Sequence, residues 1–230
     1  MGIGRREFLK LFGGTLAALT ANPSSAIAIF DDQYINRKLG IAFHKPQGWT
    51  FADVKEMGEV RAGQILDLED TELARELVES SRLPILTISK DKLSSRANRF
   101  TPGVTIFSDR IEFPDDFPEE FHDDGLDFFE LEIPALKIAV ADIESCQSML
   151  KDFRVMSALT PNQVSECDAA EYRATFVFEH ENMRPTPVRM RTLVIYQRPA
   201  IYTLRMYDSP CSGPELTFDY TSFVEGVKMV

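Results

Sequence analysis

Three segments in which apolar and polar residues alternate, joined by short connections, constrain the fold more than any other feature. They cover residues 172–179, 188–196 and 201–207. Alternation with a period of two is typical of strands with one buried face. The connection at residues 197–200 is too short for the crossover that parallel strands need. The sequence therefore predicts that these segments are antiparallel neighbours in one sheet.

Earlier in the chain, residues 83–89 and 103–113 also read as strands. A proline lies at or near the end of each, and a proline cannot donate to a strand ladder, so we expect one of the two at a sheet edge. A further strand is predicted over residues 39–44, followed by a turn at Pro46 and Gly48. Trp49 would then begin a returning strand.

Apolar residues at helical spacing predict three helices. The first covers residues 70–81, and the third follows a candidate capping box of Ser212 and Glu215. The apolar stripe of the second helix runs through Leu136, Ala139, Val140, Ile143, Cys146, Leu150 and Phe153. Helices and strands are segregated rather than alternating, which indicates an α+β fold with helices flanking an antiparallel sheet. Residues 29–230 are enough for one such domain.

Residues 1–28 are set apart as a predicted export signal. The pattern resembles a twin-arginine signal, with a short apolar stretch at residues 11–21 and a small-x-small cleavage site. The residues that carry it are Arg5, Arg6, Phe8, Leu9 and Lys10, with Ala26 and Ala28 at the cleavage site. The alternative is an amphipathic N-terminal helix with two chance arginines. The signal predicts a periplasmic location, or the thylakoid lumen in a photosynthetic organism.

The charge balance limits the partners. The predicted signal contains three basic and one acidic residue, so the 25 basic and 36 acidic residues of the chain fall to 22 and 35, a net charge of about −13. Such a surface repels nucleic acid and anionic headgroups. The compatible partners are cations or a protein with a basic patch. After cleavage, no segment could span a bilayer, although peripheral association with a membrane through a protein partner stays open.

The stretch Gly40, Ile41, Phe43, Pro46, Gly48 and Trp49 resembles the opening of the PsbP-type fold. The strand–strand–strand–helix order from Tyr172 to Phe223 is similar too. This resemblance, which extends to the DcrB-type envelope proteins, implies an α-β-α sandwich. It also implies a non-enzymatic binding or assembly factor.

No catalytic motif stands out. The sequence contains no Gly-x-Ser-x-Gly, phosphate-binding glycine loop or His-Glu-x-x-His. His44 and Lys45, beside the predicted turn, are either polar turn residues or a functional pair. Cys146, Cys167 and Cys211 match no metal or redox spacing; they are either small buried residues or contain one disulfide.

The acidic segment 112–132 is the remaining candidate site. Its oxygens and one imidazole are a candidate divalent-cation site formed by Asp116, Glu120, His122, Asp123 and Asp124. The same segment could instead dock a protein partner through Asp115, Phe117, Glu119 and Phe121. A third interpretation is a solvated acidic loop.

These patterns together predict an exported, non-enzymatic binding or assembly factor that acts through protein contacts. The alternative is a periplasmic hydrolase or metal-dependent enzyme centred on His122 and its neighbouring carboxylates.

Overall fold

The computed structural model of the chain describes residues 27–52, 64–66, 84–91, 100–110, 134–181, 183–198, 200–212 and 216–230. The predicted export signal up to Ala26 and the predicted helix over residues 70–81 lie outside these ranges. Ala28, at the predicted cleavage site, lies in the first described strand, β1 (Ile27–Phe30).

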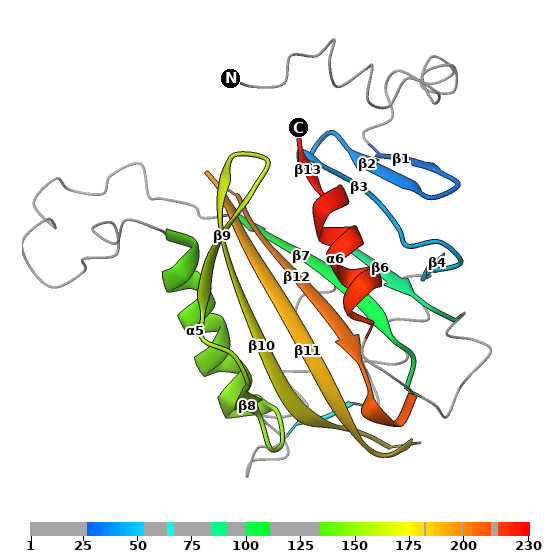
Figure 1. Cartoon of the computed structure of the whole chain (residues 1–230), viewed down its shortest axis with the longest axis vertical. Helices are drawn as coiled ribbons and strands as arrows, with labels where there is room; N and C mark the ends of the chain where they lie inside the picture. The colour runs from blue at the N-terminus through cyan, green and yellow to red at the C-terminus, as the bar shows by residue number, and fades with distance from the viewer. Residues whose placement is uncertain are drawn as a thin grey trace, which may run out of the picture.

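A large antiparallel sheet forms the centre of the described fold (Figure 1). Its strand order is β4-β6-β7-β12-β11-β10-β5, and β8 and β9 also pair with β10. The strands are β4 (Thr50–Phe51), β5 (Gln64–Ile65), β6 (Leu86–Ser89), β7 (Gly103–Arg110), β8 (Arg154–Val155), β9 (Thr160–Val164), β10 (Cys167–His180), β11 (Met183–Gln197) and β12 (Ala200–Asp208). The three alternating segments lie in β10, β11 and β12, so the predicted antiparallel order of these neighbours is confirmed.

A smaller sheet has the order β1-β2-β3-β13. Besides β1 it contains β2 (Gln33–Asn36), β3 (Ile41–His44) and β13 (Lys228–Met229). The last strand of the chain thus pairs with β3, which joins the two ends of the domain.

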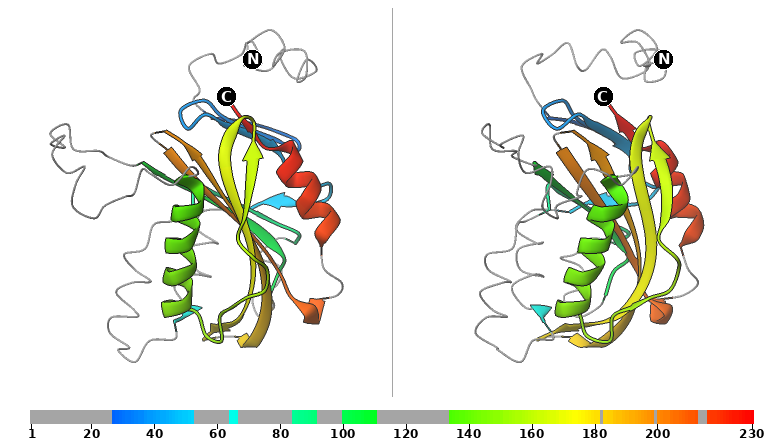
Figure 2. Two further views of the ribbon diagram at one scale, coloured as in Figure 1. Left: turned by 60° about the vertical axis from the view of Figure 1, so that its left-hand side comes forward. Right: turned by 90° about the vertical axis from the view of Figure 1, so that its left-hand side faces the viewer.

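Two described helices lie on opposite faces of the large sheet, as Figure 2 shows. They are α5 (Pro134–Met149) and α6 (Thr217–Gly226), with a short 3-10 turn, η3 (Pro210–Ser212), before α6. The predicted α+β class and the helix–sheet–helix layering are confirmed. Among the described residues, no helix is long and apolar enough to cross a bilayer.

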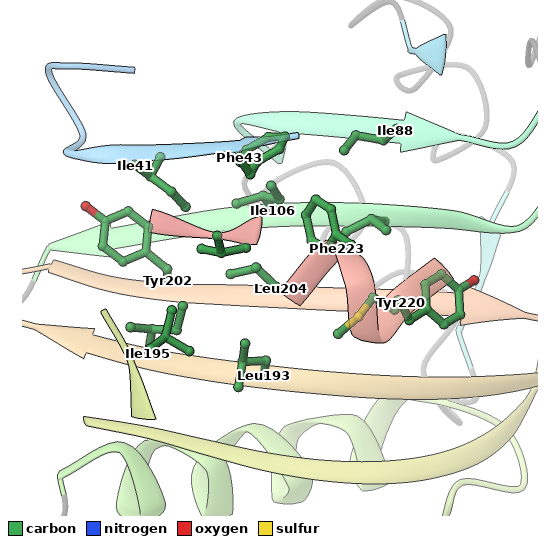
Figure 3. Packing of buried hydrophobic residues seen from close by; sticks show 14 of the residues in the cluster. Ile41, Phe43, Ile88, Ile106, Leu193, Ile195, Tyr202, Leu204, Tyr220 and Phe223 are labelled. Carbon is green, nitrogen blue, oxygen red and sulfur yellow. The ribbon is translucent and has the colours of Figure 1, made fainter. Parts of the chain in front are cut away.

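Each face of the large sheet covers its own core. On the α6 face, Leu193 and Leu204 pack with Phe43 of the smaller sheet and Phe223 of α6 (Figure 3). On the α5 face, side chains such as Val194 and Met190 pack beneath α5. Because successive residues of a strand point to opposite faces, the alternation in β10 to β12 supplies both cores.

Several predictions about single elements were wrong. Trp49 does not begin a strand that pairs back on β3, because β4 pairs with β6 in the other sheet. The turn, with Gly48 at a φ of 79° and the Trp49 N–H donating to the Pro46 carbonyl, therefore carries the chain from one sheet to the other. Neither β6 nor β7 is an edge strand, since the prolines lie outside the paired residues.

The helices also differ from prediction. The second helix ends at Met149, so Phe153 lies beyond it, and Val140 is 45% exposed rather than part of the buried stripe. The third helix begins at Thr217, with Leu216 at its N-cap and no side-chain cap on Leu216, so it starts later than a capping box at Ser212 predicts; Glu215 lies outside the described residues.

Candidate functional site

The predicted metal and docking residues Asp115, Asp116, Phe117, Glu119, Glu120, Phe121, His122, Asp123 and Asp124 lie outside the described residues. They stay predictions. Within the described ranges, no group of three or more His, Cys, Asp or Glu side chains could hold a metal ion.

Lys45 stabilises the turn that follows β3. Its Nζ donates to Asp32 Oδ1 at 2.5 Å and lies 5.9 Å from the centre of the Phe51 ring. Trp49 is 4% exposed and packs edge-on against Tyr220, with 6.0 Å between ring centroids. These contacts agree with the interpretation of Lys45 as a turn residue.

A polar cluster fastens α5 to the sheet. The buried residues of the helix are all small: Ala135, Ala139 and Cys146. Asp142, on the same side, accepts a hydrogen bond from the Tyr172 hydroxyl at 2.6 Å and forms an ion pair with the Arg205 guanidinium. The Arg205 guanidinium also lies over the Phe107 ring, 5.5 Å from its centre. One carboxylate therefore connects the helix to both β10 and β12.

Burial keeps the other titratable groups of this cluster uncharged. Burial, with the Asp142 carboxylate adding to it, raises the pKa of Tyr172 far above its ordinary value. Burial also raises the pKa of the Cys146 thiol, although Arg205 opposes this effect. The pKa of Tyr207 is raised by burial as well. The ion pair of the cluster is thus the one between Arg205 and Asp142.

The cluster continues as a polar row across five strands. Tyr172, Thr192, Arg205, Thr105 and Thr87 are successive cross-strand partners from β10 to β6. In the part of the chain that the structure describes, the Thr87 hydroxyl is buried without a hydrogen-bond partner, whereas the Thr192 and Thr105 hydroxyls lie beside those of Tyr172 and Tyr207. A buried polar group without a partner reduces stability. The α5 face of the sheet therefore carries a continuous row of polar side chains.

On the α6 face, two arginines of β11 bind carboxylates. Arg191 donates to both carboxylate oxygens of Glu171, at 2.8 and 2.9 Å, and to the Thr221 hydroxyl of α6 at 3.1 Å. Arg189 donates to Asp208 at 2.6 Å. The other oxygen of Asp208 accepts the Leu216 N–H at 2.9 Å. Asp208 thus accepts the backbone N–H at the N-cap of α6 and anchors the start of this helix.

Beyond these pairs, the same face carries an exposed group that we call the arginine patch: Arg154, Met156 and Arg173. Arg154 lies opposite Thr175, and Thr175 lies opposite Arg189. Arg173 lies opposite Arg191. Directly opposed residues of antiparallel strands share a face, so these arginines all belong to the α6 face.

Sequence reasoning missed both arginine groups. The available signal was parity: Arg189 and Arg191 alternate in phase with Leu193 and Ile195, so four successive positions on one face read Arg, Arg, Leu, Ile. Charged residues in phase with a buried set indicate buried ion pairs or a site. Their carboxylate partners come from β10 and β12 and could not be named from this pattern.

The three cysteines are unbridged. Cys146 is buried, Cys167 is partly buried and Cys211 is exposed. Burial raises the pKa of the Cys167 thiol, and the nearby Asp168 adds to the effect. The interpretation as small buried residues fits Cys146 and does not fit Cys211.

Comparisons with known proteins place this chain near several solved structures. No family model matches it, and no curated protein matches it by sequence. The cyanobacterial PsbP (CyanoP) of Synechocystis is similar with 10% identity and a TM-score of 0.47, over 90% of this chain and 99% of that one. LpqN of Mycobacterium tuberculosis, described as involved in cell envelope biogenesis, has 13% identity and a TM-score of 0.42, over 82% of each chain. A Pseudomonas aeruginosa protein described as a putative regulator has 13% identity and a TM-score of 0.38, over 54% of this chain and 70% of that one. Likenesses of this size say nothing about what the chain binds.

Proposed function

We propose that this chain is an exported, non-enzymatic binding or assembly factor that acts through protein contacts. In this proposal the acidic segment 112–132 is one docking element and can bind a divalent cation. The observation that carries the proposal is the use of the buried carboxylates. Asp142, Glu171 and Asp208 are each engaged by an arginine that fastens a helix or a neighbouring strand to the sheet.

A general acid or base needs a titratable group within reach of a substrate. The three carboxylates have another task, because they hold α5 and α6 on opposite faces of the sheet. A sheet fixed in this way is a rigid scaffold. Binding residues are commonly found on loops that a rigid scaffold positions. The acidic balance of the chain favours a partner with a basic surface.

A photo-crosslinking experiment tests this function. A benzoylphenylalanine is placed at Phe117 or Phe121 of the full chain, expressed in its native envelope, with the same group at Lys38 as the control. Lys38 is exposed and follows β2. We expect protein adducts from positions 117 and 121 only, and fewer adducts when Asp115, Asp116, Glu119 and Glu120 are changed to their amides.

Metal analysis of protein purified without chelator separates this proposal from the enzyme alternative. A cation that assists docking should increase the yield of adducts when it is added back. The proposal fails if no adduct forms and the purified chain turns over a small substrate in a reaction that His122→Ala abolishes.

A further inference from the structure

We propose that the arginine patch is a second interaction surface, which binds an acidic segment of a protein partner. This surface is separate from the acidic segment 112–132 and has the opposite charge. The inference goes beyond the proposed function, because that function assigns the partner a basic surface and gives this face of the sheet no role.

Strand register places the patch. Met156 continues the line of β8, since its N–H donates to the Arg173 carbonyl at 2.8 Å. Arg173 in turn has its own N–H bonded to the Ser157 hydroxyl at 3.0 Å. Met156 therefore lies opposite Arg173, in the same register that sets Arg154 opposite Thr175. Two exposed arginines and one exposed methionine are thus fixed to a rigid strand pair.

Exposure distinguishes this group from the buried pairs beside it. Met156 is 65% exposed, and the Arg173 side chain is 44% exposed. The Arg191 side chain, one strand further in, is only 13% exposed because it is held by Glu171 and Thr221. In Figure 1, β8 and the adjoining part of β10 lie to one side of the α6 ribbon. The outer members of the patch can therefore reach a partner without displacing α6.

The charge of this region is opposite to that of the chain. Around the patch, the strand positions on this face carry four arginines, Arg154, Arg173, Arg189 and Arg191, and the carboxylates Glu171 and Asp208. Glu179, further along β10, pairs with Lys151. Even if the exposed Asp152 in the turn before β8 is counted, the arginines remain in excess. Glu171 is shared by two of these arginines: the Arg173 Nε lies 4.0 Å from its Oε1, and Arg191 donates to both of its oxygens.

The chemistry of the patch fits a carboxylate ligand with an apolar anchor. Guanidinium groups bind carboxylates in two-point geometry with little loss of conformational freedom. An exposed methionine between them offers a soft apolar contact that adapts to different side chains. A short segment with several Asp or Glu residues and one large apolar residue matches both features.

A large polyanion matches the patch less well. A membrane or a nucleic acid presents its charge over an area much wider than the patch, so it also meets the surrounding acidic surface of a chain with net charge −11. A short acidic segment contacts only the patch, because exposed charges beyond about 8 Å are screened at physiological salt. We therefore assign the patch to a protein segment.

The test uses the full chain and a labelled probe peptide, Ac-DEDFEEDLDE-NH2, in fluorescence anisotropy at 50 mM salt. Its control is the same peptide with amides in place of carboxylates. We expect saturable binding of the acidic peptide that weakens with added salt, and no binding of the amide peptide. Arg173→Glu should weaken binding roughly tenfold, as should Arg154→Glu. Met156→Ser should weaken it roughly threefold.

Arg37→Glu is the matched control, because Arg37 is exposed between β2 and β3 and outside the patch. It should change the affinity less than twofold. Circular dichroism and the melting temperature show whether each variant folds. If a variant of the patch does not fold, the binding of Arg154→Gln is measured in its place.

Three outcomes would overturn the proposal. The first is equal loss of binding in Arg37→Glu and Arg173→Glu. The second is binding to vesicles with 30% phosphatidylglycerol, but not to the peptide. The third is a reversible dimer in sedimentation velocity that Arg173→Glu abolishes, because a second copy of the chain would then occupy the patch.

Discussion

At the scale of single residues, the two glycines with positive φ have different tasks. Gly40 has a φ of 75°, and a Cβ there would lie 2.9 Å from the Val230 carbonyl oxygen. Its own carbonyl accepts the Val230 N–H at 2.8 Å, which closes the C-terminal strand onto β3. Gly48 has a φ of 79°, and a Cβ there would meet nothing within 4 Å.

This difference predicts unequal effects of two alanine substitutions. Gly48→Ala should lower the free energy of unfolding by about 1–2 kcal/mol, the strain of a left-handed backbone. Gly40→Ala should lower it by about 1–3 kcal/mol more, because the methyl group also displaces the Val230 backbone. Urea unfolding of both variants measures the difference. Equal effects would mean that the chain end moves without a penalty.

Residue patterns determined how much of the site could be predicted. The place of Lys45 beside Pro46 indicates a turn residue, but its carboxylate partner Asp32 lies 13 positions away and could not be named from that place. The Arg191–Glu171 pair joins residues on neighbouring strands. Which carboxylate meets which arginine depends on register, and a slip of one residue would turn both to the other face. Sequence alone does not determine that register.

At the scale of elements, α5 combines apolar packing, which includes the partly buried Leu136 and Ile143, with one polar link to the sheet. Its buried side chains are small, and Asp142 supplies the link to Arg205 and Tyr172. We therefore expect Asp142→Asn to lower the free energy of unfolding by about 2–4 kcal/mol, since it leaves a buried guanidinium without its anion.

Hydrogen exchange identifies where this loss occurs. In Asp142→Asn, the amides of α5 should exchange faster while those of β11 and β12 keep their protection. Glu144→Gln is the matched control, because Glu144 lies on the exposed side of the same helix. Uniform acceleration over the whole sheet would show instead that α5 and the sheet unfold as one unit.

The elements that could be predicted are those with a strong local pattern. Strands β10 to β12 alternate over many residues, and their turns are short. Strand β9 escaped prediction because four of its five residues are exposed and it contains Pro161. Its turn to β10 uses Ser165 and Glu166 at φ values of 48° and 69°, where Asn-Gly is the usual signal. The smaller sheet was not predicted, because its strands β3 and β13 are separated by almost the whole length of the chain.

At the scale of the whole molecule, three tyrosines link stability to alkaline pH. Burial raises the pKa of Tyr34, of Tyr172 and of Tyr207 above the ordinary value of 10.0. In the unfolded chain these phenols lose their protons near pH 10, whereas in the folded chain they keep them. The unfolded state then binds fewer protons than the native state, so stability is fully present below pH 10 and falls as the pH rises above it.

The expected slope follows from the number of groups. Each tyrosine should lower the free energy of unfolding by about 1.4 kcal/mol per pH unit above pH 10, up to about 4 kcal/mol per unit for all three. Urea titrations at pH 8, 9, 10 and 11 measure this slope. Tyr34→Phe removes one of the three groups, and the hydrogen bond lost with it comes only from the neighbouring Asn36. The variant should therefore have a shallower slope, with a loss of at most about a third, while its stability at pH 8 changes by about 1 kcal/mol or less. A slope that Tyr34→Phe leaves unchanged would contradict a contribution of Tyr34 to the alkaline sensitivity.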